Sequence, residues 1–385
     1  MRWSPRLLQV VGALATGLAV ATLTPSSVPA VSAVGSADAG GRAVALAGAA
    51  DSTGPVGAAP GRALAGPAPQ LAHVRFGSPQ SISDSGVLVA RALGYFQEQG
   101  LDVETVPIQS GSDLIAPLAS GDLDTGGGTF SIALLNAIER GIGLRIVADK
   151  GNSRQGFQFS QLLVRKDLRD DGEVQQITDL RGRKLAVSAT RAGSESVLAH
   201  ILARGGLSID DTDVTVLGYP DMLLAFGNRA IDGAIVIEPS IAIALDRGLA
   251  SSWEQGYSGE AYGGVYQAGI LLYSGRFAAQ TDEAQRFMVA YIKGARAYND
   301  AFAKGQGRAD MVRLLTEQTS VKDPALYDRM QMAGLDPDGR LNRASLQMEL
   351  DYFRNRGYYN GSVDLDTAID TSFAERAVQQ LGPYQ

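Results

Sequence analysis

Hydroxyl groups and glycines gather at four points of the sequence, each near the change from a β-like run to a helical one. These points are residues 78–85, 110–112, 126–131 and 188–196. The start of a helix leaves backbone N–H groups free, and a nearby serine or threonine hydroxyl can donate or accept a hydrogen bond. The pattern predicts sites that hold polar or anionic groups of a small molecule, with helix capping as the alternative for the first segment.

The candidate contact residues come from these segments and from one acidic residue. They are Gln80, Ser81, Ser83, Asp84, Gly111, Ser112, Thr129, Phe130, Ser131, Thr190, Gly193, Ser194 and Glu238. The glycines 126–128 would let a ligand approach the backbone closely, and Phe130 either stacks on a flat ligand or belongs to the core. Glu238 either holds a donor group of the ligand or stabilises a helix start. Further candidates for the rim of the site are Tyr219, Tyr262 and Tyr266.

Composition narrows the chemistry that this site can perform. The chain has no cysteine and two histidines, His73 and His200. Thiol nucleophiles, disulfides and thiolate metal sites are therefore excluded, and two isolated imidazoles do not favour a metal site. Glu238 is the one obvious acid or base, and the sequence shows no partner for it. We expect a protein that is not an enzyme and that uses no cofactor and no metal.

Charge is informative about partners. The net charge is −7, and the lysines and arginines are scattered along the chain. A nucleic-acid surface needs clustered positive charge. We therefore expect no nucleic-acid partner.

The N-terminus has the pattern of an export signal. Arg2 and Arg6 accompany an apolar run, residues 7–23, and the small residues 31–33 suit a signal peptidase. Residues 1–33 are therefore typical of a signal peptide. A membrane anchor is the alternative, but the apolar run is short and is interrupted by polar and glycine residues.

The segment that follows the predicted signal peptide, residues 34–72, consists almost entirely of alanine, glycine, serine, proline and valine. It has too little large apolar surface to offset the entropy lost on ordering, so a flexible segment is predicted. Because no cysteine is available to carry a lipid, we expect a soluble protein in the periplasm or at the cell exterior, not a lipid-anchored one.

From residue 74 onward, strand-like and helical stretches alternate, which predicts a largely parallel sheet with helices on both faces. The expected order is strand 74–77, helix 85–99, strand 103–108, helix 112–118, strand 125–128, helix 131–140 and strand 144–148.

A second block of the chain repeats this order. Asp113 and Asp124 are 11 residues apart, as are Asp221 and Asp232. In each pair the first aspartate opens a helix and the second opens a strand. We interpret this as one βαβ design used twice, once in each of two lobes.

Two strand-like crossings between the blocks, near 160–166 and 268–275, predict a hinge with two crossings. Lobe one would then comprise residues 74–163 and 272–385, and lobe two residues 164–271. The remainder of the chain beyond the second crossing has the pattern of helices that return to lobe one.

Four short motifs in order resemble a known family. Residues 93–103, LGYFQEQGLDV, resemble its GYF-x-x-x-GLDV signature. Residues 118–124 resemble L-x-x-G-x-x-D, residues 179–187 resemble DLKGKKVAV, and residues 230–239 resemble VDAA followed by a proline. The family is the SsuA/THI5-like, or NMT1-like, family of nitrate-, sulfonate-, taurine- and thiamine-pyrimidine-binding proteins.

This resemblance implies the α/β type II periplasmic-binding-protein fold, with a ligand held between two lobes joined by a hinge. It implies a solute-binding component that delivers a small organic or anionic solute to an ABC permease. We expect the protein to be a monomer. Many relatives carry an aromatic residue before the acid at Glu238, whereas this chain has Ile237. The solute stays open among a sulfonate, nitrate, a pyrimidine and an aromatic acid.

Two alternatives fit the same fold. One is a sensor or interaction module that presents its closed form to a receptor. The other is a small-molecule lyase or synthase. The pyrimidine synthases that resemble this family depend on iron, histidine and a cysteine-rich motif. This chain has no cysteine and only two histidines, neither of which lies in a predicted cleft segment.

Overall fold

The computed structural model describes residues 70–385, and every structural statement below concerns that part of the chain. The predicted signal peptide and nearly all of the predicted flexible segment lie outside the described residues. The described part consists of two lobes, each built on a five-stranded sheet.

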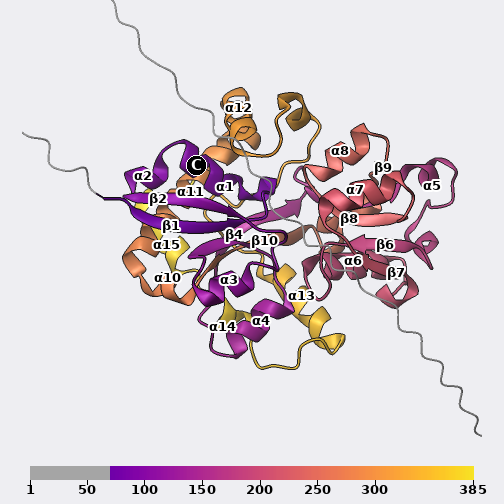
Figure 1. Cartoon of the computed structure of the whole chain (residues 1–385), viewed down its shortest axis with the longest axis horizontal. Coiled ribbons are helices and arrows are strands. Elements are labelled where there is room, and N and C mark those ends of the chain that lie inside the picture. Colours follow the sequence, from indigo (N-terminus) through magenta and orange to yellow (C-terminus); the bar gives the residue numbers. More distant parts are fainter. Residues whose placement is uncertain (1–69) are drawn as a thin grey trace, which may run out of the picture. The chain divides into compact units, whose positions relative to one another are not determined.

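The first sheet has the strand order β2-β1-β3-β10-β4 (Figure 1). Its strands are β1 (Ala72–Ser78), β2 (Leu101–Pro107), β3 (Thr125–Gly128), β4 (Arg145–Arg154) and β10 (Val265–Tyr273). Strand β1 is parallel to β2 and β3, whereas β10 is antiparallel to β3 and β4. A strand from late in the chain therefore completes a sheet made of early ones.

The second sheet has the order β7-β6-β8-β5-β9. Its strands are β5 (Ser160–Arg165), β6 (Lys184–Val187), β7 (Asp213–Val216), β8 (Gly233–Ile237) and β9 (Ala250–Ser251). Strand β6 is parallel to β7 and β8, whereas β5 is antiparallel to β8 and β9. Both sheets thus share one pattern, which confirms the predicted two-lobed α/β architecture; each sheet is mixed, with two parallel and two antiparallel pairings.

The helices surround the two sheets (Figure 1). They are α1 (Ser85–Ala92), α2 (Tyr95–Glu98), α3 (Ile115–Ser120), α4 (Ile132–Glu139), α5 (Lys166–Asp170), α6 (Gly193–Arg204), α7 (Tyr219–Gly227), α8 (Ser240–Asp246), α9 (Ser258–Ala261), α10 (Gly275–Ala279), α11 (Thr281–Phe302), α12 (Arg308–Gln318), α13 (Arg343–Asn355), α14 (Leu365–Ala368) and α15 (Ser372–Leu381).

One helix differs from the sequence prediction: the expected helix 85–99 is broken at Gly94, which has a φ of 78°. Glycine adopts this left-handed conformation without a steric penalty, so α1 ends there and α2 begins.

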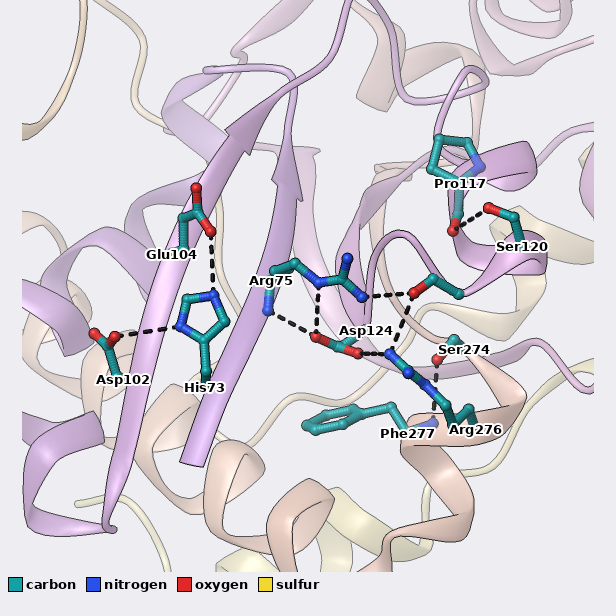
Figure 2. A network of polar contacts seen from close by, with 11 residues as sticks. His73, Arg75, Asp102, Glu104, Pro117, Ser120, Asp124, Ser274, Arg276 and Phe277 are labelled. Carbon is teal, nitrogen blue, oxygen red and sulfur yellow. Dashed lines mark hydrogen bonds and ion pairs between the residues drawn. The ribbon is translucent and has the colours of Figure 1, made fainter. Parts of the chain in front are cut away.

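The repeated aspartates have the same role in the two sheets. The Asp124 carboxylate accepts a hydrogen bond from the Arg75 backbone N–H at 2.8 Å, and Asp232 accepts one from the Lys184 backbone N–H at 2.9 Å. Each aspartate stands just before its strand and ties that strand to the parallel neighbour. Figure 2 shows Asp124 between the guanidinium groups of Arg75 and Arg276. The equal spacing of the two aspartate pairs therefore reflects one local design at the strand starts.

Helix α13 packs against both lobes. Leu346, Leu350 and Phe353 belong to an apolar cluster with side chains of α3, α4 and the first sheet. Met348 and Tyr352, on the same helix, pack against the cluster formed by α6 and the second sheet. Apolar side chains on different faces of one helix thus join the two lobes beside the cavity described next.

Candidate functional site

The four predicted segments meet at one cavity between the two sheets. Its lining comes from the turns after β1, β2 and β3 on the first lobe and after β6 and β7 on the second. These are carboxyl ends of parallel strands, where ligands bind in open α/β sheets. The cavity volume is about 60 Å³. One water molecule needs roughly 10–15 Å³ of such space, so the cavity has room for only a few waters or a small solute.

The first-lobe wall is rich in hydroxyl groups. Five predicted residues line it: Ser81, Ser83, Gly111, Ser112 and Thr129. The hydroxyl oxygens of Ser81 and Ser83 are 3.0 Å apart, and those of Ser112 and Thr129 are 3.5 Å apart. Gly111 lets the two turns approach, because a Cβ placed there would lie only 3.0 Å from the Thr129 nitrogen. These groups can donate or accept hydrogen bonds.

Lys150 also lines this wall and was missed by the sequence analysis. Its Nζ is 2.7 Å from the Oδ1 atom of Asp84, and the two side chains are only 3% and 0% exposed. The ammonium passes over Gly127, where an added Cβ would lie 2.5 Å from Nζ. A lysine two residues after the largely apolar run 144–148 was the available signal, since a charged residue within a buried strand needs a partner.

Asp84 was predicted to contact a ligand, but it lies behind the wall. Its Oδ2 atom accepts hydrogen bonds from the Ser78 hydroxyl at 2.7 Å and from the Ser81 backbone N–H at 3.1 Å. With Lys150 on Oδ1, both carboxylate oxygens are engaged within the protein. The residue holds the lysine and the turn after β1 in place.

The second-lobe wall combines hydroxyl and apolar groups. Ser188, Ser194 and Tyr219 line it, together with apolar side chains that include Phe159, Val197, Ile235 and Ile237, and Tyr266 of β10 lines the cavity as well. The Ser194 hydroxyl donates to the Ala189 carbonyl at 2.9 Å and accepts from the Ala189 N–H at 3.2 Å, which closes the turn before α6. The Tyr219 hydroxyl donates to Ser188 at 3.3 Å. This wall therefore offers both apolar side chains and hydroxyl groups.

Three predicted residues of the first lobe lie away from the cavity. Phe130 is buried in the core and stacks on Phe353 at a centroid distance of 6.2 Å, so it is not free to stack on a ligand. Ser131 caps α4, its hydroxyl accepting from the Leu134 N–H at 3.3 Å. Gln80 turns into a separate surface hollow beside α12. Burial of its apolar ring explains why Phe130 is in the core, and helix capping explains the position of Ser131.

Two predicted residues of the second lobe are also outside the lining. Thr190 is exposed at the turn before α6. Gly193 is buried, and a Cβ placed on it would lie 2.5 Å from the Tyr266 hydroxyl and 3.3 Å from Glu349 Oε1. Gly193 therefore makes room for the side chains behind the wall.

Glu238 is fully buried, and its carboxylate faces the C-terminal part of the chain instead of the cavity. Its Oε1 accepts from the Gln331 N–H at 2.9 Å and its Oε2 from the Ala242 N–H at 3.0 Å. Loss of solvent raises the pKa of Glu238 to about 7, and the two backbone N–H donors oppose that rise. The expected pairing of Glu238 with a ligand group has no geometric support.

The two lobes touch each other around the cavity. The Ile132 N–H donates to the Arg191 carbonyl at 3.1 Å, which joins the turn before α4 to the turn before α6. Tyr352 of α13 donates to Glu195 of α6 at 2.8 Å. Arg356 pairs with Asp210 through two hydrogen bonds of 2.6 and 2.8 Å. The cavity is thus held between walls that are themselves bonded to one another.

Two general features bear on chemistry and location. Among residues 70–385, no cluster of three or more histidine, aspartate or glutamate side chains could hold a metal ion. No helix in the same range combines the length and the apolar character that crossing a bilayer requires.

Comparison with known proteins agrees with this architecture. A family model described as NMT1/THI5 like matches residues 82–303. A protein of Brucella abortus described as a binding protein is 20% identical over 284 residues, which cover 71% of this chain and 76% of that protein. The family match covers strands of both sheets.

Solved structures share the fold at low sequence identity. The alkanesulfonate-binding protein SsuA from Xanthomonas axonopodis pv. citri, bound to MOPS, has a TM-score of 0.62 and 20% identity, covering 79% of this chain and 99% of its own. The periplasmic nitrate-binding protein NrtA from Synechocystis PCC 6803 has a TM-score of 0.65 and 15% identity, covering 82% and 90%. The desulfurization enzyme DszB has a TM-score of 0.55 and 15% identity, covering 80% and 99%. The fold is therefore shared by binding proteins and by at least one enzyme.

Proposed function

The chain belongs to the NMT1/THI5-like family, and from this premise we propose that it is the exported solute-binding component of an ABC importer. It captures one small solute between its lobes and delivers that solute to a membrane permease. The observation that carries the proposal is the cavity at the carboxyl ends of strands from both sheets, lined by hydroxyls from both lobes. The exported, soluble character of the mature protein is part of the same proposal.

The chemistry of the cavity favours binding over catalysis. The lining residues include no histidine, no carboxylate and no cysteine in the described part of the chain. Lys150 is engaged with Asp84, and the Ser194 hydroxyl is engaged within its own turn. A nucleophile needs an adjacent base, and such a pair is not formed by the lining side chains. This supports a binding protein in preference to a lyase or synthase on the same fold.

A ligand screen with a blocked cavity tests the proposal. Nitrate, alkanesulfonates, pyrimidines and aromatic acids are screened by thermal shift, and hits are measured by calorimetry. One compound should bind with a stoichiometry of one and remain chemically unchanged. At 100 times its Kd it should add about 2.7 kcal/mol of stability.

The matched variants are Ala189→Phe, which fills the cavity, and Ala230→Phe, which places the same ring on an exposed position. Ala189→Phe should abolish binding and Ala230→Phe should retain it. Turnover of the compound, or equal binding by both variants, would contradict the proposal.

A further inference from the structure

The cavity contains one positive side chain whose charge is already balanced. Lys150 is the one charged residue in the lining among residues 70–385. Its Nζ carries three N–H donors, of which one is bonded within the described structure, at 2.7 Å to Asp84. Lys150 lines the cavity together with Ser81 and Ser83, and its remaining donors have no partner among the described residues. The group is therefore available to an acceptor atom of a solute without offering net charge.

Three other charged groups near the cavity do not change this balance. Glu238 is buried and faces Gln331 and Ala242 instead of the cavity. Glu349 is behind the wall, beside Gly193. Arg191 is exposed and lies over the ring of Tyr358, 5.1 Å from its centroid. None of the three supplies a positive charge to the lining.

A full anion entering this cavity would leave water and meet no uncompensated cation. Burial of an unpaired charge is costly, whereas an uncharged acceptor needs only hydrogen-bond donors. Donors are abundant on the first-lobe wall, and the opposite wall presents Phe159, Ile235 and Ile237. The lining suits a small molecule with a polar acceptor end and an apolar or flat body.

We propose that Lys150, held by Asp84, selects an electrically neutral solute and binds its carbonyl, sulfonyl or ring-nitrogen acceptor through the N–H groups that Asp84 leaves free. This inference rests on the proposed solute-binding function and names the charge class of its ligand. Asp84 acts as a positioning residue that cancels the charge of Lys150. Removal of the Asp84 charge should convert the same pocket into an anion site.

The test uses pairs of probes that match in shape and differ in charge. The pairs are urea and nitrate, dimethyl sulfone and methanesulfonate, and nicotinamide and nicotinate. Binding of each probe to the wild-type protein is measured by calorimetry. In every pair that binds, the neutral member should bind at least tenfold more tightly than the anion.

Two variants separate selection by charge from a structural role of the ion pair. Asp84→Asn keeps an acceptor for Ser78 and Ser81 and leaves Lys150 uncompensated, so the preference should reverse by at least tenfold towards the anion. The double variant Lys150→Met with Asp84→Asn removes both charges together and should bind neither member. Thermal melting followed by circular dichroism verifies that each variant is folded, because Lys150→Met alone would strand a buried carboxylate.

The outcomes distinguish this inference from the proposed function. Tighter binding of the anions by the wild-type protein, or an unchanged preference in Asp84→Asn, overturns the inference and leaves the binding function standing. Unaltered binding by the double variant also overturns it. Absence of saturable binding by every probe, neutral and anionic, overturns both.

Discussion

Glu238 and Glu349 are both buried where the C-terminal part of the chain meets the second lobe, yet their surroundings are opposite. Each Glu238 oxygen accepts a backbone N–H, one from Gln331 and one from Ala242. Glu349 is 1% exposed, and within residues 70–385 no backbone N–H donates to either of its oxygens. Burial by itself therefore says little about what a carboxyl group contributes; the number of donors that reach it decides.

The difference in hydrogen-bond donors also affects the pKa values of the two carboxyl groups. Desolvation raises the pKa of both groups, and for Glu238 the two N–H donors limit the rise to about 7. For Glu349 burial raises the pKa well above 4.5, and the neighbouring Tyr266 opposes this only in part. Glu349 thus lies in the interface between α13 and the second lobe as a group that is best accommodated uncharged.

The largest effect on stability should come from removing the Glu238 carboxyl group, which accepts two backbone N–H groups. Glu238→Ala leaves two buried N–H groups without an acceptor and opens a cavity between α8 and the C-terminal segment. We expect the free energy of unfolding to fall by about 3 kcal/mol or more, since each stranded donor costs roughly 1–3 kcal/mol. Urea denaturation at pH 6 measures it. Glu238→Gln retains one acceptor and should lose less; equal stability of wild type and Glu238→Ala would break the comparison.

Removal of the charge at Glu349 should raise the free energy of unfolding instead of lowering it, and the size of this gain should depend on pH. Because its folded-state pKa lies above the ordinary value of 4.5, its favourable neutral form is complete below that pH and is lost as pH rises. Glu349→Gln should therefore match wild type at pH 4 and be more stable by about 1–3 kcal/mol at pH 8. Urea denaturation at both values measures the difference. The exposed Glu375→Gln is the control, and a gain independent of pH would refute the assignment.

A smaller effect is expected for the hydroxyl that joins α13 to α6. Tyr352→Phe removes the donor to Glu195 Oε1 but leaves the Arg191 N–H on Oε2 at 2.9 Å. The loss should be about 1 kcal/mol, the usual value for one hydrogen bond. Small-angle scattering of the unliganded protein should also show a greater share of open forms, because this bond crosses between the lobes. No change in either quantity would place the contact outside the lobe interface in solution.

The smallest effect should come from the surface pair of Arg356 and Asp210. Both groups reach solvent, with side-chain exposures of 31% and 67%. Exposed ion pairs contribute about 0–1 kcal/mol and are screened by salt. Arg356→Ala should thus change the unfolding free energy by less than 1 kcal/mol, and the difference should vanish in 1 M salt. A large loss that persists in salt would show that this side chain stabilises the interface by packing.

The local parts of the site could be predicted because they depend on near neighbours in sequence. Ser81, Ser83, Ser112 and Thr129 stand where a strand ends and a helix or turn begins, and that position alone carries them to the cavity. Ser194 was found in the same way. Phe130 was left open between ligand and core, and the packing of Phe353 resolves that choice.

The sequence by itself determined the alternation of strands and helices, the repeated aspartates that start equivalent strands, and the hydroxyl-rich turns, because each depends on contacts between residues close in the chain or in neighbouring strands. Only the tertiary structure decided which charges face the cavity. Lys150 meets Asp84 across 66 residues and Glu238 meets Gln331 across 93. Such pairings depend on how distant segments pack, and burial changes the free energy of a charge by more than any local preference does.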